Sequence, residues 1–163
     1  MKRLYTLSIS ILISLSTMAS HVIGGEILIT HISGYQYNLE FIFYRDMTGI
    51  TGPDTIYIQA ESRANLNNVE TFGLTKDSVL TLSSSVVGCG FINLKLAEYY
   101  SLQVNLPPSV YNNPGGYIFR LASCCRNPVL NIQNSPSSGY NFVTFFPPVV
   151  DSFGNQIINS TPK

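Results

Sequence analysis

Apolar and polar residues alternate along much of this chain. Between Tyr35 and Phe43 an aromatic or aliphatic side chain occupies every second position, and Gln36, Asn38 and Glu40 lie between them. A period of two residues is that of a β-strand with one buried and one solvated face. Aromatic side chains at these positions fit a pleated, half-buried surface.

Turn-forming residues divide this pattern into strands. Ser33-Gly34 separates two β-rich runs, so residues 26–44 are predicted to form a hairpin. Pro107-Pro108 ends one later run and Pro147-Pro148 another, because proline cannot donate to a strand ladder. Further strands are predicted at residues 55–60, 78–84, 98–106, 116–123 and 140–146.

Two stretches, residues 60–70 and 91–98, look weakly helical but lack a cap and an apolar stripe. Six to eight short strands therefore predict an all-β fold, an antiparallel β-sandwich that is Ig-like or related to it. We expect one domain at residues 20–150 and a polar C-terminal tail at residues 151–163 that adds no closing strand. An edge strand left open there would be available for pairing with another chain.

The first 19 residues are organised like a secretory signal peptide. Lys2 and Arg3 precede a short apolar run, which ends in small residues at Ala19 and Ser20. The run is short and interrupted by serine, so a membrane anchor is the weaker interpretation. We therefore expect cleavage after Ala19 and no membrane insertion of the chain that remains.

Charge narrows the choice of partners. Without Lys2 and Arg3, seven of the nine basic residues remain against nine acidic ones, and only 11% of the whole sequence is charged. Such a surface has no electrostatic reason to bind nucleic acid or anionic lipid. The expected partners are other surface-protein modules, extracellular glycans or extracellular proteins.

Three cysteines, Cys89, Cys124 and Cys125, are disulfide candidates, because secretion places thiols in an oxidising compartment. Neighbouring residues of a strand point to opposite faces, so the adjacent pair cannot both face the core. A bridge from Cys89 to either of them would close a loop of about 36 residues and stabilise the fold by roughly 3–4 kcal/mol. A strained bridge within the adjacent pair is the alternative, and one cysteine is left over in either case.

An ordered set of short motifs gives the chain a resemblance to a known family. The motifs are SHVIGGEI at 20–27, YRD at 44–46, GCG at 88–90, LPP at 106–108, CCRN at 124–127 and NSTP at 159–162. Together they resemble the N-terminal module of large secreted surface proteins of Bacteroidetes, of the gliding-motility-associated or PKD-domain-containing type. The resemblance covers essentially the whole chain after the signal peptide. In that family further β-sandwich domains follow the module, and a C-terminal sorting domain directs export by the type IX route.

The chain departs from the family pattern in two ways. Met47 stands where members commonly have a cysteine after the YRD motif. The resemblance therefore implies that one bridge is lost and that Cys89 keeps its own, which explains the odd thiol. The chain also stops where members continue. We interpret it as a truncated product or a stand-alone module that is secreted or held at the cell surface, and periplasmic if it is not exported further.

Catalytic signatures are sparse. The sequence has no nucleophile elbow, dinucleotide fingerprint or phosphate loop. A nucleophile built from Cys125 and His31, or a zinc site from the cysteines and one histidine, is a weaker interpretation than structural use of cysteine. Asp46 and Asp54 flank a loop that could hold calcium, but turn roles are the preferred interpretation. We expect no enzyme activity, no cofactor and no metal.

The candidate functional residues fall into two groups. Tyr44, Arg45, Asp46, Arg126 and Asn127 form the structural motif, and an ion pair between Arg126 and Asp46 is preferred to ligand binding. Tyr99, Tyr111 and Tyr117 lie near the loop at 107–116 and are candidate ligand contacts outside the core, although ordinary cross-strand packing is the preferred interpretation.

Taken together, these patterns predict a secreted, non-enzymatic structural or adhesive module of a bacterial cell-surface protein. A carbohydrate-binding module or a carbohydrate-active hydrolase domain is the alternative. A hydrolase would need two carboxyl groups that converge on a cleft.

Overall fold

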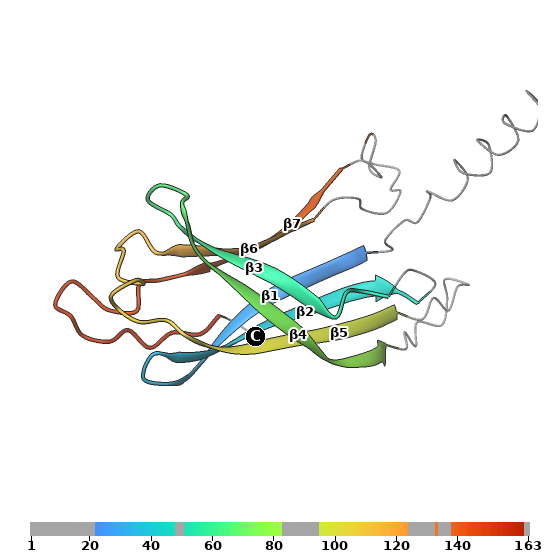
Figure 1. Ribbon diagram of the computed structural model, residues 1–163, viewed down its shortest axis with the longest axis horizontal. Helices are drawn as coiled ribbons and strands as arrows, with labels where there is room; N and C mark the ends of the chain where they lie inside the picture. The colour runs from blue at the N-terminus through green and yellow to red at the C-terminus, as the bar shows by residue number, and fades with distance from the viewer. Residues whose placement is uncertain (1–21, 48–50, 83–94, 124–132, 134–137, 162–163) are drawn as a thin grey trace, which may run out of the picture.

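The computed structural model describes residues 22–47, 51–82, 95–123, 133 and 138–161, and every structural statement below refers to them. Their regular structure consists of seven strands (Figure 1). The strands are β1 (Val22–Ser33), β2 (Gln36–Asp46), β3 (Thr55–Ser62), β4 (Asn68–Leu82), β5 (Lys95–Asn105), β6 (Tyr117–Ser123) and β7 (Tyr140–Phe146).

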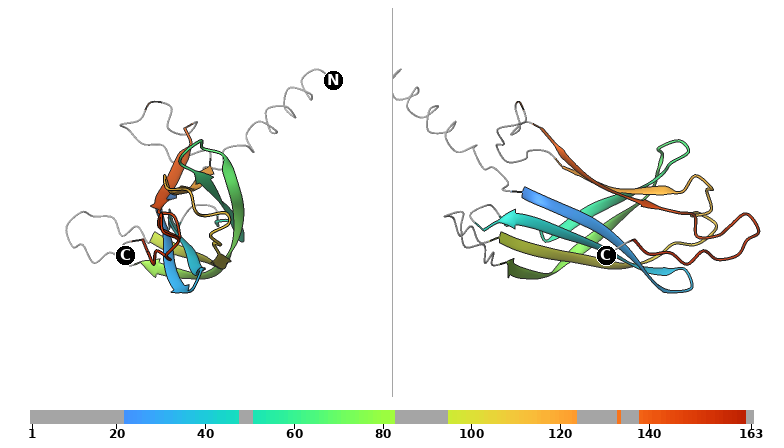
Figure 2. Two further views of the ribbon diagram at one scale, coloured as in Figure 1. Left: turned by 90° about the vertical axis from the view of Figure 1, so that its left-hand side faces the viewer. Right: turned by 180° about the vertical axis from the view of Figure 1, so that it is seen from behind.

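All seven strands belong to one antiparallel sheet, in the order β1-β2-β5-β4-β3-β6-β7. The sheet curls until its two edge strands, β1 and β7, face each other without being joined by a ladder, so the molecule is nearly closed (Figure 2, left). The prediction of an antiparallel all-β fold, a sandwich or a related arrangement, is confirmed. The two layers across the core are parts of one continuous sheet.

The first hairpin follows the alternation in the sequence. β1 pairs with β2 in a register that places Ile29 opposite Leu39 and Ile27 opposite Phe41. The turn between them contains Gly34, whose φ of 51° lies in the left-handed region that glycine adopts without strain. The predicted hairpin over residues 26–44 is therefore confirmed.

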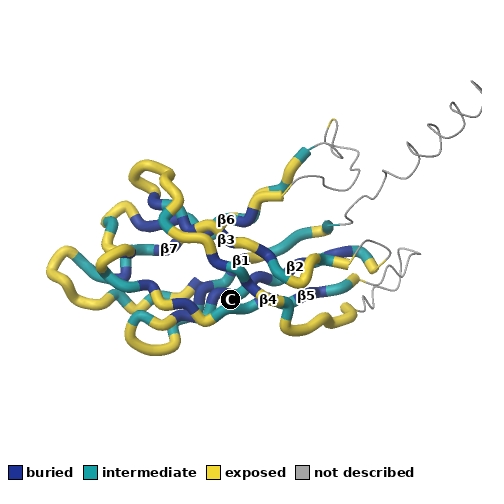
Figure 3. The backbone as a smooth tube through the Cα atoms, viewed as in Figure 1, coloured by how far each residue is buried: buried dark blue, intermediate teal, exposed yellow. Residues whose placement is uncertain are grey.

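The core fills the inside of the curled sheet, where the buried residues gather (Figure 3). β2 supplies its central row, because alternate residues from Tyr37 to Phe43 point inward. The largest fully buried side chains are Tyr37, Phe41, Tyr100, Tyr111, Tyr117 and Phe119. A core this rich in aromatic rings accounts for the high aromatic content of the sequence.

One predicted strand was wrong in extent, and one of the two weakly helical stretches belongs to strands and a turn. β4 begins at Asn68, ten residues before the predicted strand at 78–84, and residues 60–70 form the end of β3, a turn and the start of β4. The first half of β4 is mostly polar and exposed, and only Phe72 and Leu74 point into the core. Two apolar residues give too weak a pattern for a strand to be recognised.

The sheet has two distinct ends. The turn end carries the β1–β2 turn, the β3–β4 turn and the β5–β6 connection, and the segment after β7 also lies there (Figure 1). At the loop end β1 begins and β2, β4 and β6 finish, since strands that alternate in direction bring these termini together. The connections after β2, β4 and β6 therefore start from the same end.

The C-terminal segment, residues 149–161, folds back on the sheet although residues 151–163 were predicted to be a tail outside the domain. Val150 forms a bridge with Gln156, and the Ile157 N–H donates to the Val149 carbonyl (2.8 Å). Thr161 is buried against β1, where its N–H donates to the carbonyl of Ile29 (2.9 Å). Polar composition did not reveal this packing, because the contacts are made by backbone and hydroxyl groups.

Candidate functional site

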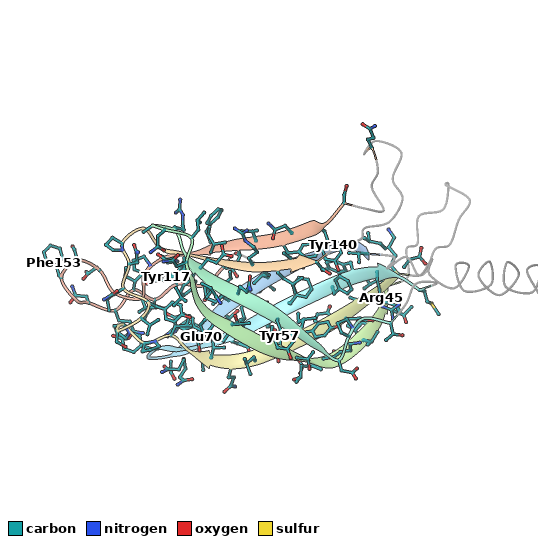
Figure 4. All side chains as sticks on the ribbon, turned by 45° about the horizontal axis from the view of Figure 1, so that its top comes forward. Arg45, Tyr57, Glu70, Tyr117, Tyr140 and Phe153 are labelled. Carbon is teal, nitrogen blue, oxygen red and sulfur yellow. The ribbon has the colours of Figure 1, made fainter. Side chains whose placement is uncertain are left out.

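A cluster of charged side chains lies inside the sheet at the loop end. It consists of Arg45 on β2, Lys76 on β4, and Glu98 and Tyr100 on β5, and is called the Glu98 cluster below. Arg45 continues the inward face of β2 beyond Phe43, and Lys76 continues the inward face of β4 beyond Leu74. Figure 4 shows Arg45 at this end of the molecule, away from Phe153 at the turn end.

The Glu98 carboxylate is the centre of this cluster. Arg45 Nε donates to Glu98 Oε1, and Lys76 Nζ lies 3.2 Å from Oε2. The Tyr100 hydroxyl lies 2.9 Å from Oε2 and 2.8 Å from the Pro53 carbonyl oxygen, so it can donate to either one. Two cations thus balance the carboxylate in one interior site.

The loop that precedes β3 covers the cluster. The Gly52 N–H donates to Glu98 Oε1 (3.4 Å), and Lys76 Nζ donates to the Gly52 carbonyl (2.7 Å). A Cβ atom at Gly52 would lie 2.3 Å from Glu98 Oε2 and 2.8 Å from the Tyr100 hydroxyl. Only glycine fits here without displacing the cluster.

Burial and hydrogen bonding act on the Glu98 carboxyl in opposite directions. Glu98 is 0% exposed, and this burial alone would raise its pKa. The hydrogen bonds from Arg45, Tyr100 and Lys76 and the charge of Arg45 outweigh that effect and hold the pKa of Glu98 below its usual value. Burial and the hydrogen bond to Glu98 raise the pKa of the Tyr100 hydroxyl. The carboxylate therefore stays charged and the phenol stays neutral at ordinary pH.

These properties are those of a structural ion cluster. A catalytic general acid such as that of a glycosidase needs a carboxyl group with a raised pKa and access to substrate. Glu98 has the opposite shift and is enclosed. Breaking such a cluster by removing one member leaves uncompensated buried charge, which is strongly destabilising.

A cavity of about 280 Å³ opens beside the cluster at the same end. Four aromatic residues line it: Phe41 and Phe43 from β2, Tyr57 from β3 and Tyr140 from β7. Its described wall also includes the hydroxyl residues Thr55 and Ser123 and contains no acidic residue; the other lining residues are Pro53, Ile56, Leu121 and Ala122. The cavity could therefore contact a ligand through aromatic residues and a few neutral hydrogen-bonding groups.

The nine acidic residues of the sequence all lie in described parts of the chain. Glu61 pairs with Arg120 (3.1 Å), and Glu70 accepts a hydrogen bond from Tyr111 (3.0 Å). Asp151 accepts hydrogen bonds from the N–H groups of Phe153 and Asn155 (2.8 Å each), which lowers its pKa, with the Asn155 side chain the largest contribution. Among the described residues no group of three or more His, Cys, Asp or Glu is placed to hold a metal ion.

The predicted structural motif divides between described and undescribed parts. Tyr44 points to the outer face of β2 and donates to Glu26 (2.7 Å), and this hydrogen bond, with burial second, raises the Tyr44 pKa to about 12. Arg45 is buried and pairs with Glu98, a partner that the sequence analysis did not assign. Asp46 lies opposite Lys95 in the β2–β5 register.

The remaining motif residues, Arg126 and Asn127, lie outside the described residues. The predicted pairing of Arg126 with Asp46 therefore stays a prediction. Cys89, Cys124 and Cys125 also lie outside the described residues. Their pairing therefore stays a prediction.

The candidate role of Tyr111 and Tyr117 as ligand contacts outside the core is not supported, and the preferred interpretation, packing, holds for both. Both are buried, with ring centroids 4.9 Å apart. The Tyr117 hydroxyl donates to the Val110 carbonyl (2.7 Å), so the two rings fix the β5–β6 connection to the core. Tyr99 is partly buried on the outer face of β5. Tyr117 packs from β6 and Tyr111 packs from the β5–β6 connection.

Other aromatic residues are exposed instead. Tyr57 is 66% exposed beside the cavity, Phe145 is 62% exposed on the outer face of β7, and Phe153 is 88% exposed in the turn after β7. Strand parity would have identified Tyr57, because it falls between the inward residues Ile56 and Ile58.

Two further findings bear on function. In the part of the chain that the structure describes, no helix has the length and hydropathy needed to cross a membrane. Comparison of the chain with known protein families, with curated proteins and with solved structures found no match.

Proposed function

We propose that this chain is a non-enzymatic structural or adhesive module of a secreted bacterial surface protein. The observation that carries the proposal is the Glu98 cluster. The best-placed charged groups for chemistry are enclosed and paired with one another, so they serve the fold. The exposed aromatic residues Tyr57 and Phe145 leave the outer face of the sheet able to contact other molecules.

The signal-peptide organisation and the motif resemblance support the surface location and the bacterial setting of this proposal. The proposed disulfide, from Cys89 to Cys124 or Cys125, has topological support. The strands that precede these cysteines, β4 and β6, run in the same direction and finish at the same end of the sheet. Peptide mapping without reduction tests this pairing, and three free thiols would contradict it.

The non-enzymatic assignment can be tested on the hydrolase alternative. The purified chain is incubated with a panel of p-nitrophenyl glycosides, and release of nitrophenolate is followed. We expect no turnover above the buffer blank. Turnover that is abolished by Glu98→Gln, but kept by Glu40→Gln on the outer face of β2, would contradict the proposal and would make Glu98 a catalytic group.

The location can be tested in cells. A bacterial host with a type IX export route expresses the chain, and intact cells are treated with a protease that cannot enter them. We expect the chain to lose its first 19 residues and to be cleaved at the surface, found in the medium or recovered from the periplasm. A chain that is protected in the cytoplasm and retains its first 19 residues would refute secretion.

A second candidate, a carbohydrate-binding module, is favoured by one observation. Tyr57, which is 66% exposed, lines the cavity together with Tyr140 and the hydroxyl residue Thr55. A sugar ring could stack on such an aromatic surface while its hydroxyls bond to the polar groups. A glycan array probed with the chain and with Tyr57→Ala tests this. Binding lost in Tyr57→Ala but kept in Phe153→Ala supports the candidate, and equal binding or none rejects it.

A further inference from the structure

The edge of β1 that faces β7 carries backbone hydrogen-bonding groups. In an antiparallel pair, residues alternate between those bonded to the neighbouring strand and those whose N–H and C=O groups point away from it. The N–H and C=O of Ile29 point away from β2, because both bond to Thr161. The β1–β2 register then places the corresponding groups of Ile27 and Gly25 on the same outer edge.

The chain's own C-terminal segment occupies only part of this edge. The Thr161 N–H donates to the Ile29 carbonyl (2.9 Å), the Ile29 N–H donates to Thr161 Oγ1 (2.9 Å), and the His31 N–H donates to Ser160 Oγ (2.9 Å). Ser160 lies at His31 and Thr161 at Ile29, so the segment runs antiparallel to β1. Two of the three bonds use side-chain hydroxyls where a regular strand would use carbonyl groups.

The edge beyond this point is unpaired within the described chain. No described residue bonds to the outward N–H or C=O of Ile27 or Gly25. β1 and β7 diverge toward the end where β1 begins, as both views of the sheet show (Figures 1 and 2). Unpaired strand edges are the places at which proteins accept an added strand.

The inner side of the gap between the edges of β1 and β7 is apolar. Phe142 and Tyr140 of β7 are only partly buried, and their rings are 5.3 Å apart. Phe142 reaches across to Phe41 on β2 (5.3 Å between ring centroids). The Phe41 ring also lies beneath Gly25, where a Cβ atom would come within 2.7 Å of it. A strand laid along β1 would therefore place alternate side chains on these aromatic rings.

We propose that the outer edge of β1, at Gly25 and Ile27, is an acceptor site for one extended polypeptide strand of a partner, which pairs antiparallel to β1 in line with Ser160-Thr161. The occupant is a single strand because the segment that already pairs with this edge is a single extended segment. The edge of a second copy would bring its own neighbouring strands into the space beside β7. The residues of the partner strand that face the core are apolar, and they alternate with polar residues. The site involves β1, β2, β7 and the segment at Ser160-Thr161, and it does not depend on the proposed function.

The probe is a synthetic nine-residue peptide of alternating valine and threonine with a lysine at each end. Residues of an added strand that bond to β1 opposite Ile27 have their side chains on the inward face, as Thr161 has. These residues are the valines of the probe. Methylating the valine amides removes the bonds to β1, and methylating the threonine amides leaves those bonds intact and provides the matched control.

The measurement is amide hydrogen exchange by NMR on the whole chain, with and without saturating probe, together with the affinities of the two methylated peptides. We expect exchange at Gly25 and Ile27 to slow at least tenfold while Leu28, which already pairs with β2, stays unchanged. The valine-methylated peptide should bind at least tenfold more weakly than the threonine-methylated one. No protection at Gly25 and Ile27, or equal affinities, would overturn the inference. Protection that appears with rising protein concentration alone would overturn it too, by showing a second copy as the occupant.

Discussion

Replacing Glu98 by glutamine is the sharpest perturbation of the buried cluster. The substitution keeps the size of the side chain but removes its charge, so Arg45 and Lys76 lose the carboxylate that both of them contact. Their side chains are only 7% and 13% exposed, which leaves little water to replace the carboxylate. The glutamine NH₂ group would also face donors instead of acceptors.

The expected loss follows from the geometry. At 3.2 Å, the Lys76–Glu98 attraction alone amounts to about 5 kcal/mol for an effective dielectric constant of about 20. Part of this is offset by desolvation of the carboxylate, which the variant no longer incurs. Removing one partner of a buried pair typically costs about 3–5 kcal/mol. That is a large share of the roughly 5–15 kcal/mol by which domains are stable.

The assay is urea unfolding followed by circular dichroism, because the chain has no tryptophan to report by fluorescence. Glu98→Gln should lower the free energy of unfolding by about 3–5 kcal/mol and the Tm by roughly 6–20 °C. The control is Glu40→Gln, a carboxylate on the outer face of β2, which should change stability by less than about 0.5 kcal/mol. Equal stabilities of the two variants would refute the claim that the cluster holds the sheet together.

Three further outcomes are expected. The pKa of Glu98 is lower in the folded chain than in the unfolded one, so its ionised form stabilises the fold. This contribution is complete above the pKa of an unfolded glutamate and is lost as the pH falls through the lower folded-state pKa. Urea titrations across acidic pH should show this loss in the natural chain and less of it in Glu98→Gln. Gly52→Ala should destabilise the fold by about 1–3 kcal/mol, since its Cβ would lie 2.3 Å from the Glu98 carboxylate, whereas Gly24→Ala, whose Cβ meets nothing nearer than 4.0 Å, should cost less in the same urea unfolding assay. Thr161→Ala should cost about 0.5–1.5 kcal/mol and speed hydrogen exchange at the Ile29 amide, while Thr161→Ser should restore both; unchanged exchange in the alanine variant would show that the segment does not pair with β1.

Much of the fold follows from local sequence patterns. The β1–β2 hairpin was predictable because a long alternation meets a glycine turn, and the proline pairs correctly ended β5 and β7. The early start of β4 was not predictable, because that half of the strand buries only Phe72 and Leu74. Its position depends on pairing with β3 and β5, which are distant in the sequence.

The buried cluster left a signal in the sequence that composition alone does not show. Glu98 has the same parity as Tyr100 and Val104 on the apolar face of its strand, and Arg45 has the same parity as Phe43. A charge at an inward position near the end of each of two strands indicates an interior ion pair. Which residues pair could not be read, because the register of β2 against β5 is set by the whole sheet.

The candidate role of Tyr111 and Tyr117 as ligand contacts failed for a similar reason. Both lie at or beside the β5–β6 connection, which is polar and rich in proline and glycine, so an exposed position was a candidate. In the fold this connection turns back on the sheet, and the two rings enter the core from its end. A connection that packs on the sheet through long-range contacts shows no regular spacing of apolar residues in the sequence.

The most direct test of the central claim, that Glu98 is a structural group charged at ordinary pH and not a catalytic acid, is an NMR titration of its side-chain carboxyl carbon. The account predicts a pKa below the usual glutamate value, because Arg45, Tyr100 and Lys76 all stabilise the charged form. A pKa raised toward neutrality would contradict it and would give Glu98 the property of a general acid.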